Sequence, residues 1–357
     1  MNLTFVYLRK DKCPWESAMS DGYFILLREL VRRGVLTSAR FLIDCWTDPP
    51  ERRDIAPGMV LEKVNGLDGV ELEPGAAVWI RAGWKTWIPW IEKQHNAGHW
   101  LLFYGAGVPH HAWPFWDVVL DDTNAATWVV DDRGRFPGRL CAHFRKALSP
   151  FFRFIPVKRD YDFCLGANFI YGRKGQDIAY AALHRYTELT GTKPRAIMPG
   201  GLRRGEVTYQ ILREVERLGD LEIPGHLPRA ELADRFNRSK VFMHLGTSTQ
   251  GDRGPIEAGR TGCQLLLGHR RRHATYLFNA PIPPKVPVVE RDLTEIAGLM
   301  AQAAAEDTDD LRQLTSAYFV REDGLGDVGS LYLTRILDVM RENPQADRAL
   351  LRKVFSQ

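Results

Sequence analysis

The sequence has few cysteines and no long hydrophobic run, and both shortages restrict the classes of protein to which it can belong. Its 5 cysteines are widely spaced and include no Cys-x-x-Cys pair, which argues against a disulfide framework and against a zinc site. No apolar run approaches the roughly 18 residues of a membrane span, so we expect no integral membrane segment. The sequence therefore predicts a protein of a reducing compartment, either the cytoplasm or, for a viral protein, the cytoplasm of the host.

The bulk composition is that of an ordinary folded protein. Of the 357 residues, 45% are hydrophobic and 26% are charged, which argues against a disordered chain and supplies enough apolar side chains for sizeable cores. A single core seldom holds so long a chain, so we expect two domains. The formal net charge of +4 permits an anionic ligand without requiring one.

Short apolar runs alternate with amphipathic stretches along the whole chain. This alternation is typical of doubly wound α/β folds, in which helices cover both faces of a parallel sheet. An aromatic and basic segment that two prolines interrupt divides two such series, and we place the seam near Lys158. We therefore predict two Rossmann-like domains, residues 1–157 and 158–324, and a helical tail, residues 325–357, that could pack back on the first domain.

A pair of cations precedes one predicted helix of the second domain. The stretch GANFIYGRKGQDIAYAAL, residues 166–183, begins as a strand and places Arg173 and Lys174 just before a glycine at the start of a helix. Because a helix start carries N–H groups without helical partners and the positive end of the helix dipole, two cations there favour a phosphate site. The alternative is that both side chains only solvate a loop, as most such pairs do.

A second cluster, residues 240–268, combines a buried strand, a glycine- and serine-rich turn and a helix that begins near Gly254. Such a turn lets the backbone approach a phosphate or a sugar closely. Glu257 lies in the first turn of the predicted helix. Its carboxylate could complement the helix dipole, or its two acceptor oxygens could hold a pair of sugar hydroxyls.

These motifs resemble those of a known enzyme family. The segments LGANFIYGRKGQDIAYAAL, RAIMPGG, IPGHLPRAELADRFNRSKVFMHLGTS and GPIEAGRTGCQLLLG follow the order and approximate spacing of the C-terminal half of the retaining family 4 glycosyltransferases. The resemblance implies the GT-B fold, in which two Rossmann-like domains face each other across a cleft. It implies that Lys174 contacts the diphosphate of a nucleotide sugar and that Glu257 binds the ribose hydroxyls. The base would lie against the backbone near Gly225, His226 and Leu227.

The sequence departs from the family pattern at two places. Where the family has the first acid of its paired glutamates, this chain has Thr249, or Gln250 if the turn is one residue shorter. Where the family tends to carry an arginine shortly before its lysine, this chain has Asn168 or Ala167. Arg173 is then the candidate for the second cation beside the diphosphate.

The first domain resembles the family in outline only. Gly22, at the start of the first predicted helix, could bring its backbone N–H to the donor phosphate. His110 and His111 follow a predicted strand in a region where the family often places a histidine near the reacting sugar carbon, and a plain loop explains the pair equally well. Tryptophans crowd this half, and we expect most of them in the core. The segment 81–90 is a candidate surface for stacking on sugar rings or unpaired bases.

The resemblance implies a retaining hexosyl or pentosyl transfer that uses a nucleoside-diphosphate sugar as donor and requires no metal and no other cofactor. The acceptor would be a glycan, a lipid-linked sugar or a small molecule. The arginines of GHRRRH, GGLRRGE and FRKALSPFFRF leave open a second acceptor, a hydroxymethyl-pyrimidine base of viral DNA. A third interpretation is a protein that binds nucleotide sugars without turnover, because the first acid of the family pattern is replaced.

Overall fold

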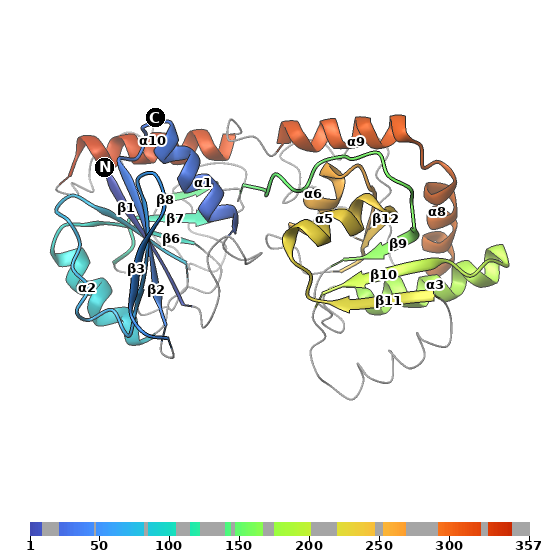
Figure 1. Cartoon of the computed structure of the whole chain (residues 1–357), viewed down its shortest axis with the longest axis horizontal. Coiled ribbons are helices and arrows are strands. Elements are labelled where there is room, and N and C mark those ends of the chain that lie inside the picture. Colours follow the sequence, from blue (N-terminus) through green and yellow to red (C-terminus); the bar gives the residue numbers. More distant parts are fainter. Residues whose placement is uncertain are drawn as a thin grey trace. The chain divides into compact units, whose positions relative to one another are not determined.

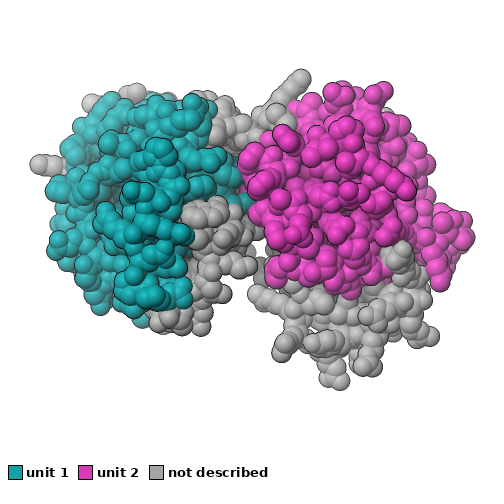
Figure 2. Space-filling view, in the orientation of Figure 1, with its two compact units in different colours: residues 1–147, 325–357 teal, residues 148–324 magenta. Residues whose placement is uncertain are grey.

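The chain folds into two compact units (Figure 2). One unit comprises Met1–Ala147 together with Leu325–Gln357, and the other comprises Leu148–Gly324. Each unit has a parallel sheet of its own (Figure 1). The computed structural model describes residues 1–8, 21–45, 48–81, 85–104, 115–121, 140–143, 147–166, 175–200, 220–246, 253–268, 292–322 and 328–344.

The boundary between the units lies at Ala147 and Leu148, whereas the sequence pattern places it at Lys158. Leu148 and Phe152 are buried in a core of the second unit. The irregular segment that follows residue 147 is therefore part of the second unit, and its prolines interrupt secondary structure without marking the domain boundary.

The C-terminal helix α10 (Val328–Glu342) belongs to the first unit, although its sequence follows the second. Its apolar residues recur at helical spacing, and the same core contains them and residues of β1 and α1. The indole Nε1 of Trp100 also donates a hydrogen bond to the carbonyl oxygen of Asn343, just beyond the helix, at 2.9 Å. The buried residues of α10 in this core are Leu333, Ile336, Leu337, Val339 and Met340.

The sheet of the first unit has eight strands in the order β3-β4-β2-β1-β5-β6-β7-β8. Neighbouring strands are parallel except β3 and β4, which form an antiparallel hairpin at one edge. This hairpin is not among the elements that the sequence predicts. The strands are β1 (Asn2–Leu8), β2 (Ser38–Asp44), β3 (Glu51–Ala56), β4 (Met59–Val64), β5 (Ala77–Ile80), β6 (Trp100–Tyr104), β7 (Val118–Asp121) and β8 (Leu140–His143).

Helices cover both faces of this sheet (Figure 1). Successive side chains of a strand point to opposite faces, so Phe5 and Tyr7 pack with α1 (Asp21–Arg32) and α10, whereas Val6 packs with the short helix η2 (Lys85–Trp87) and with α2 (Ile88–Asn96). The tryptophans that the structure describes are all buried, which confirms that most of these side chains form the core. They are Trp79, Trp87, Trp90, Trp100 and Trp116.

Two of these tryptophans lie in the segment 81–90, the candidate stacking surface. The Nε1 of Trp87 donates to Asp44 Oδ2 at 2.6 Å, and the Nε1 of Trp90 donates to the carbonyl oxygen of Val70 at 3.0 Å. Each ring is 1% exposed, so neither can stack on a ligand. For these two residues the stacking interpretation is wrong, because their polar ends find partners inside the protein and the rings can be fully buried.

The second unit has a five-stranded parallel sheet in the order β11-β10-β9-β12-β13. Residues of α5, α6 and α9 share a core with one face of this sheet, and residues of α3 and α8 share a core with the other (Figure 1). The strands are β9 (Tyr161–Leu165), β10 (Arg195–Pro199), β11 (Asp220–Gly225), β12 (Ser239–His244) and β13 (Gln264–Leu267). The helices are α3 (Gln176–Thr190), α5 (Arg229–Asn237), α6 (Gly254–Arg260), α8 (Leu293–Ala305) and α9 (Asp309–Glu322).

Both units are therefore doubly wound α/β units, as the sequence predicts. The cleft across which the two domains of a GT-B fold face each other stays a prediction. Among the described helices, none combines the length with the apolar composition that crossing a bilayer demands.

A fully buried arginine, Arg312, joins α9 to the junction of α5 with β12 and to the end of α6. The Nη1 of Arg312 donates to the carbonyl oxygen of Ser239 at 2.7 Å. Its Nη2 donates to the carbonyl oxygens of Asn237 at 2.8 Å and of Thr261 at 3.3 Å. These carbonyls lie where α5 ends, where β12 begins and just after α6, so one side chain satisfies backbone groups that would otherwise be buried without partners.

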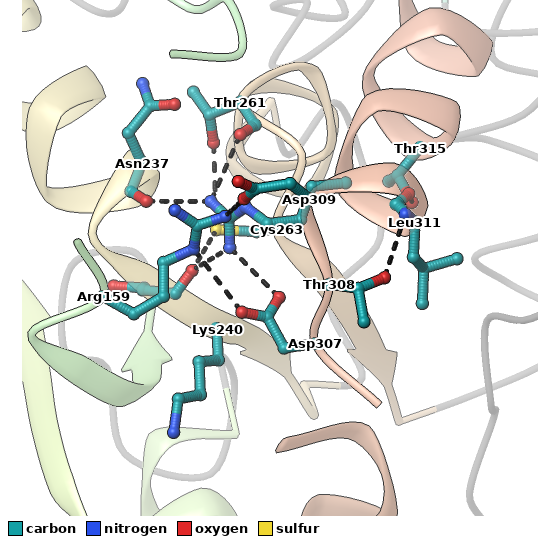
Figure 3. A network of polar contacts seen from close by, with 12 residues as sticks. Arg159, Asn237, Lys240, Thr261, Cys263, Asp307, Thr308, Asp309, Leu311 and Thr315 are labelled. Atoms are coloured by element: carbon teal, nitrogen blue, oxygen red, sulfur yellow. Dashed lines mark hydrogen bonds and ion pairs between the residues drawn. The ribbon is translucent and has the colours of Figure 1, made fainter. Parts of the chain in front are cut away.

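Asp307 supplies the negative charge beside this arginine (Figure 3). Its Oδ1 lies 3.3 Å from Arg312 Nη1, and its Oδ2 lies 3.5 Å from Arg159 Nε. Arg159 also pairs with Asp309. Burial raises the pKa of Asp307, and the two guanidinium groups oppose this rise. The network thus holds the first turn of α9 and the segment before β9 together by charge as well as by hydrogen bonds.

Replacing Arg312 by Met should lower the free energy of unfolding of the second unit by about 3–5 kcal/mol, because it removes one of the two cations beside the buried Asp307 and leaves buried carbonyls without donors. Every tryptophan of the chain lies between residues 15 and 128, so tryptophan fluorescence reports the first unit. Circular dichroism reports the unfolding of both units. A transition that appears in circular dichroism and not in tryptophan fluorescence therefore belongs to the second unit. The control is Arg185→Met, which removes an exposed pair with Glu188 at 2.8 Å and should cost under about 1 kcal/mol. Equal effects of the two substitutions would contradict a structural role for Arg312.

Candidate functional site

The second sheet has a topological switch point beside β9, its first strand in the sequence. From β9 the chain proceeds to β10 and β11 on one side, and then crosses to β12 and β13 on the other. The carboxyl ends of β9 and β12 therefore lie side by side while the connections after them diverge. In open parallel sheets this switch point is where ligands bind. The segments after β9 and β12 include the two clusters that the sequence analysis singles out.

The start of α3 lies directly against the backbone that follows β12. Gly175 precedes the helix with φ = 76°, a left-handed conformation that favours glycine. A Cβ at this position would lie 2.2 Å from the carbonyl carbon of Leu245 and 2.3 Å from the amide nitrogen of Gly246. A Cβ on Gly268, after β13, would lie 2.5 Å from the Cα of Leu245. Backbone therefore packs on backbone at this edge, and only glycine fits.

Gln176 ties the same helix start to the end of β9. Its side chain is buried, and its Nε2 donates to the carbonyl oxygen of Gly166 at 3.0 Å. Gly166 itself lies against the Phe242 ring, where a Cβ would approach a ring atom to 2.0 Å. The first turn of α3 is thus held from both strands, through Gly175 and Gln176.

Glu257 lies in the first turn of α6 and is buried, and the structure gives it two cationic neighbours. Its Oε1 accepts a hydrogen bond from Arg229 Nη2 and lies 3.3 Å from Arg253 Nε. The guanidinium of Arg229 also lies over the Phe152 ring, 4.4 Å from its centroid. No described residue donates a hydrogen bond to Oε2. One carboxylate oxygen is therefore engaged by the protein, and the other retains its capacity to accept hydrogen bonds from a ligand.

The sequence analysis predicts neither of the two arginines beside Glu257. Arg229 is 28 residues away in sequence, and the packing of α5 against α6 brings the two side chains together. Arg253 lies four residues before Glu257, at helical spacing, and this i to i+4 relation is the one signal that could have indicated a pair.

Gly225, His226 and Leu227 lie at the carboxyl end of β11, the edge strand of the same sheet. Gly225 has φ = 76°, and its carbonyl oxygen accepts from the amide of Gly200 at 2.8 Å. His226 is exposed and Leu227 is partly buried. This backbone segment therefore lies at the carboxyl end of the sheet, as the first turns of α3 and α6 do. Strand β10 lies between β11 and β9.

Gly22 lies in the first turn of α1 and is buried. Its amide donates to the Oδ1 of the preceding residue, Asp21, at 2.8 Å. The hydrogen bond between the Gly22 amide and the Asp21 carboxylate would have to break before this amide could bind a phosphate. Six further predicted site residues fall outside the described part of the chain, and their positions stay predictions: His110, His111, Arg173, Lys174, Thr249 and Gln250.

The described residues include neither a metal-binding cluster nor a cysteine with a sign of thiol reactivity. There, no group of three His, Cys, Asp or Glu side chains is placed to hold a metal ion. Cys45, Cys164 and Cys263 are buried and form no disulfide bond. Burial raises the pKa of Cys164 and of Cys263, which disfavours the reactive thiolate form. Cys164 and Cys263 are therefore poor nucleophiles.

The fold has clear counterparts among solved structures. No protein-family model and no curated protein sequence matches the chain. The crystal structure of HepE from Anabaena in complex with UDP and glucose matches with a TM-score of 0.65 and 13% identity, over 95% of this chain and 100% of that one. Sucrose-phosphate synthase from Thermosynechococcus elongatus matches with a TM-score of 0.69 and 12% identity, over 94% and 98%.

A third counterpart is the UDP-forming α,α-trehalose-phosphate synthase from Burkholderia xenovorans in complex with glucose-6-phosphate. It matches with a TM-score of 0.63 and 12% identity, over 95% of this chain and 100% of that one. These proteins are GT-B glycosyltransferases. At such low identity the likeness establishes the fold, so the chain has a GT-B fold and the resemblance that its motifs predict is confirmed at that level.

Replacing Gly175 by Ala should destabilise the second unit by about 2–5 kcal/mol, since the new Cβ both strains a left-handed residue and collides with backbone. The matched control is Gly191→Ala at the other end of α3, where φ is 69° and nothing lies within 4 Å of the added Cβ. That control should lose about 1–2 kcal/mol. Chemical unfolding followed by circular dichroism measures both. Similar losses for the two variants would show that α3 does not pack on the backbone after β12.

Proposed function

We propose that the chain is a glycosyltransferase that moves a sugar from a nucleoside diphosphate to a hydroxyl group of an acceptor, with the anomeric configuration retained. The observation that carries the proposal is the likeness to solved glycosyltransferases over nearly the whole chain. HepE was crystallised with UDP and glucose, and the Burkholderia synthase is UDP-forming. A UDP sugar is therefore the first donor to test.

The switch point of the second sheet supports a donor site there. The close approach of Gly175 to the backbone of Leu245 and Gly246 leaves no room for a side chain between them, as a phosphate-binding turn requires. Glu257 would bind the ribose through Oε2, while Arg229 and Arg253 hold Oε1. The backbone of Gly225, His226 and Leu227 would frame the base at the end of β11.

The proposed reaction breaks the bond between the anomeric carbon and the diphosphate oxygen and forms a bond from that carbon to the acceptor oxygen. The acceptor proton passes to the departing diphosphate, so the reaction needs no strong protein base. Negative charge grows on the diphosphate as the bond breaks, and fixed cations near it lower the barrier. Lys174 and Arg173, which directly precede Gly175, would supply these cations.

The other predicted site residues complete the proposal. Either His110 or His111 would lie near the reacting carbon, and the Gly22 amide would approach the distal end of the donor. Thr249 or Gln250 would stand where the family has its first acid, beside the donor sugar. Metal independence, a cytoplasmic location and the class of acceptor are part of the same proposal. No described residue favours DNA over a sugar or lipid-linked acceptor.

The test is a panel of UDP, GDP, ADP and CMP sugars, screened first by thermal shift and then for release of free nucleotide. A ligand that binds only the folded state raises the melting temperature. We expect stabilisation by UDP sugars and slow release of UDP. In Lys174→Ala, turnover should lose about 2–4 kcal/mol of transition-state stabilisation, because one charge-stabilising group acts on that scale. Lys193→Ala, which removes an exposed lysine after α3, is the control and should keep full turnover.

The panel also separates the alternatives. Stabilisation without release of nucleotide would contradict the transferase and would favour a protein that only binds nucleotide sugars. Stabilisation by none of the sugar nucleotides would contradict both. Normal turnover in Lys174→Ala would remove Lys174 from the diphosphate site while leaving the transferase in place.

Replacing Glu257 by Gln should weaken the binding of bare UDP by roughly 10- to 100-fold, because hydrogen bonds to a charged acceptor contribute on that scale. Titration calorimetry measures the affinity. Glu231→Gln, an exposed acid in the first turn of α5, is the control and should bind as the unchanged protein does. Unchanged UDP affinity in the Glu257 variant would limit this residue to its ion pairs with the two arginines.

A further inference from the structure

The first sheet has a switch point of its own, and an arginine stands at it. From β1 the chain proceeds outward to β2, and later crosses to β5 on the other side of β1. Arg81 directly follows β5, and its backbone amide donates to the carbonyl oxygen of Val6 in β1 at 3.0 Å. Its backbone is therefore fixed at the carboxyl ends of the two strands that flank the switch point, where parallel sheets bind ligands.

The side chain of Arg81 rests on an aromatic base. The carbon of its guanidinium lies 5.6 Å from the centroid of the Tyr23 ring, in the first turn of α1. Tyr23 is fully buried, with ring centroids 4.7 Å from Phe5 and 5.1 Å from Trp79. Because those rings belong to β1 and β5, the cation stands on a rigid support and loses little conformational freedom when it binds a ligand.

No acidic group within the described part of the chain compensates this charge. Arg81 is half-buried, its Nε is buried without a hydrogen-bond acceptor, and it forms no ion pair there. Arg40, a partly buried arginine of the same unit, pairs with Glu62 at 2.7 Å. Arg28 lies at the same 5.6 Å from an aromatic ring, that of Phe24, but is exposed, so water solvates it. Burying part of a guanidinium costs free energy when neither an acidic group nor water compensates its charge. An anionic ligand would offset this cost.

We propose that Arg81 binds an anionic group, a phosphate or a carboxylate, of the acceptor, so that the acceptor is an anionic sugar or a related anionic molecule. This inference rests on the proposed function, which assigns the donor to the second unit and so leaves the first unit for the acceptor. A guanidinium presents planar, parallel N–H donors that match both phosphate and carboxylate oxygens, whereas a neutral hydroxyl offers no charge to complete it. Arg81 thus selects the acceptor by charge.

The experiment uses the full chain with saturating UDP, which occupies the donor site, and titrates inorganic phosphate, glucose-6-phosphate, glucuronate and glucose by calorimetry. We expect glucose-6-phosphate or glucuronate to bind at least roughly tenfold more tightly than glucose. The better of these two probes distinguishes a phosphate from a carboxylate. Arg81→Met should weaken anion binding by roughly 10- to 100-fold. Arg81→Lys keeps the positive charge but loses the parallel N–H donors of the guanidinium, so its affinity for the anion should be intermediate.

Arg28→Met is the matched control, because it removes a cation at the same distance from a ring in the same unit, and it should bind anions as the unchanged protein does. The tryptophan fluorescence and the UDP affinity of every variant are measured as well, and unchanged values show that the first and the second unit are folded. Equal binding of all probes by the unchanged protein, or undiminished anion binding by Arg81→Met, would overturn the inference.

The failure of the proposed function has a different signature. If no nucleotide binds the unchanged protein, the transferase proposal fails. The phosphate titration is therefore run with and without UDP, and the comparison of the unchanged protein with Arg81→Met then still decides whether Arg81 binds an anion.

Discussion

The contact between the backbone of Gly175 and the backbone of Leu245 and Gly246 sets the geometry of the ligand edge in the second unit. It brings the start of α3 onto the end of β12 without a side chain between them, and Gln176 fastens the same helix start to the end of β9. Gly268 adds a third backbone segment from β13. Any residue with a Cβ at these glycines would force the segments apart, so the position of the predicted diphosphate site depends on this close approach.

Three buried or half-buried arginines show how differently the protein compensates charge. Arg312 satisfies three carbonyls and an acid, and it stabilises the fold of the second unit. Arg229 shares the Oε1 of Glu257 with Arg253 and leaves Oε2 for a ligand. Arg81 has an aromatic base and no acid in the described part of the chain. Complete satisfaction indicates a structural role, whereas an unsatisfied but rigid charge indicates a ligand, since the cost of burying it must be offset.

The two proposals divide the chemistry between the two units. Each sheet has its switch point beside its own first strand, between β9 and β12 in the second unit and between β1 and β5 in the first. The second unit would hold the nucleotide and its developing charge through helix starts, cations and Glu257. The first would hold an anionic acceptor through Arg81. In both cases the ligand meets the carboxyl ends of parallel strands, where side chains and loops converge and the strands themselves keep them in place.

The sequence by itself determined the fold class, the division into two α/β units and the ends of one helix. The helix that the pattern predicts after Lys174 is α3, Gln176–Thr190; a glycine precedes its apolar periodicity and another follows it, and this signal is local. It also indicated Glu257 as a carboxylate at a helix start. Only the tertiary structure decided that the units divide at Leu148, that Trp87 and Trp90 are core, that Arg229 reaches Glu257 and that Arg81 stands without an acid. Those features depend on strand order and on helices packing across a sheet, which bring together residues far apart in the chain, and the local spacing of residues carries no information about such contacts.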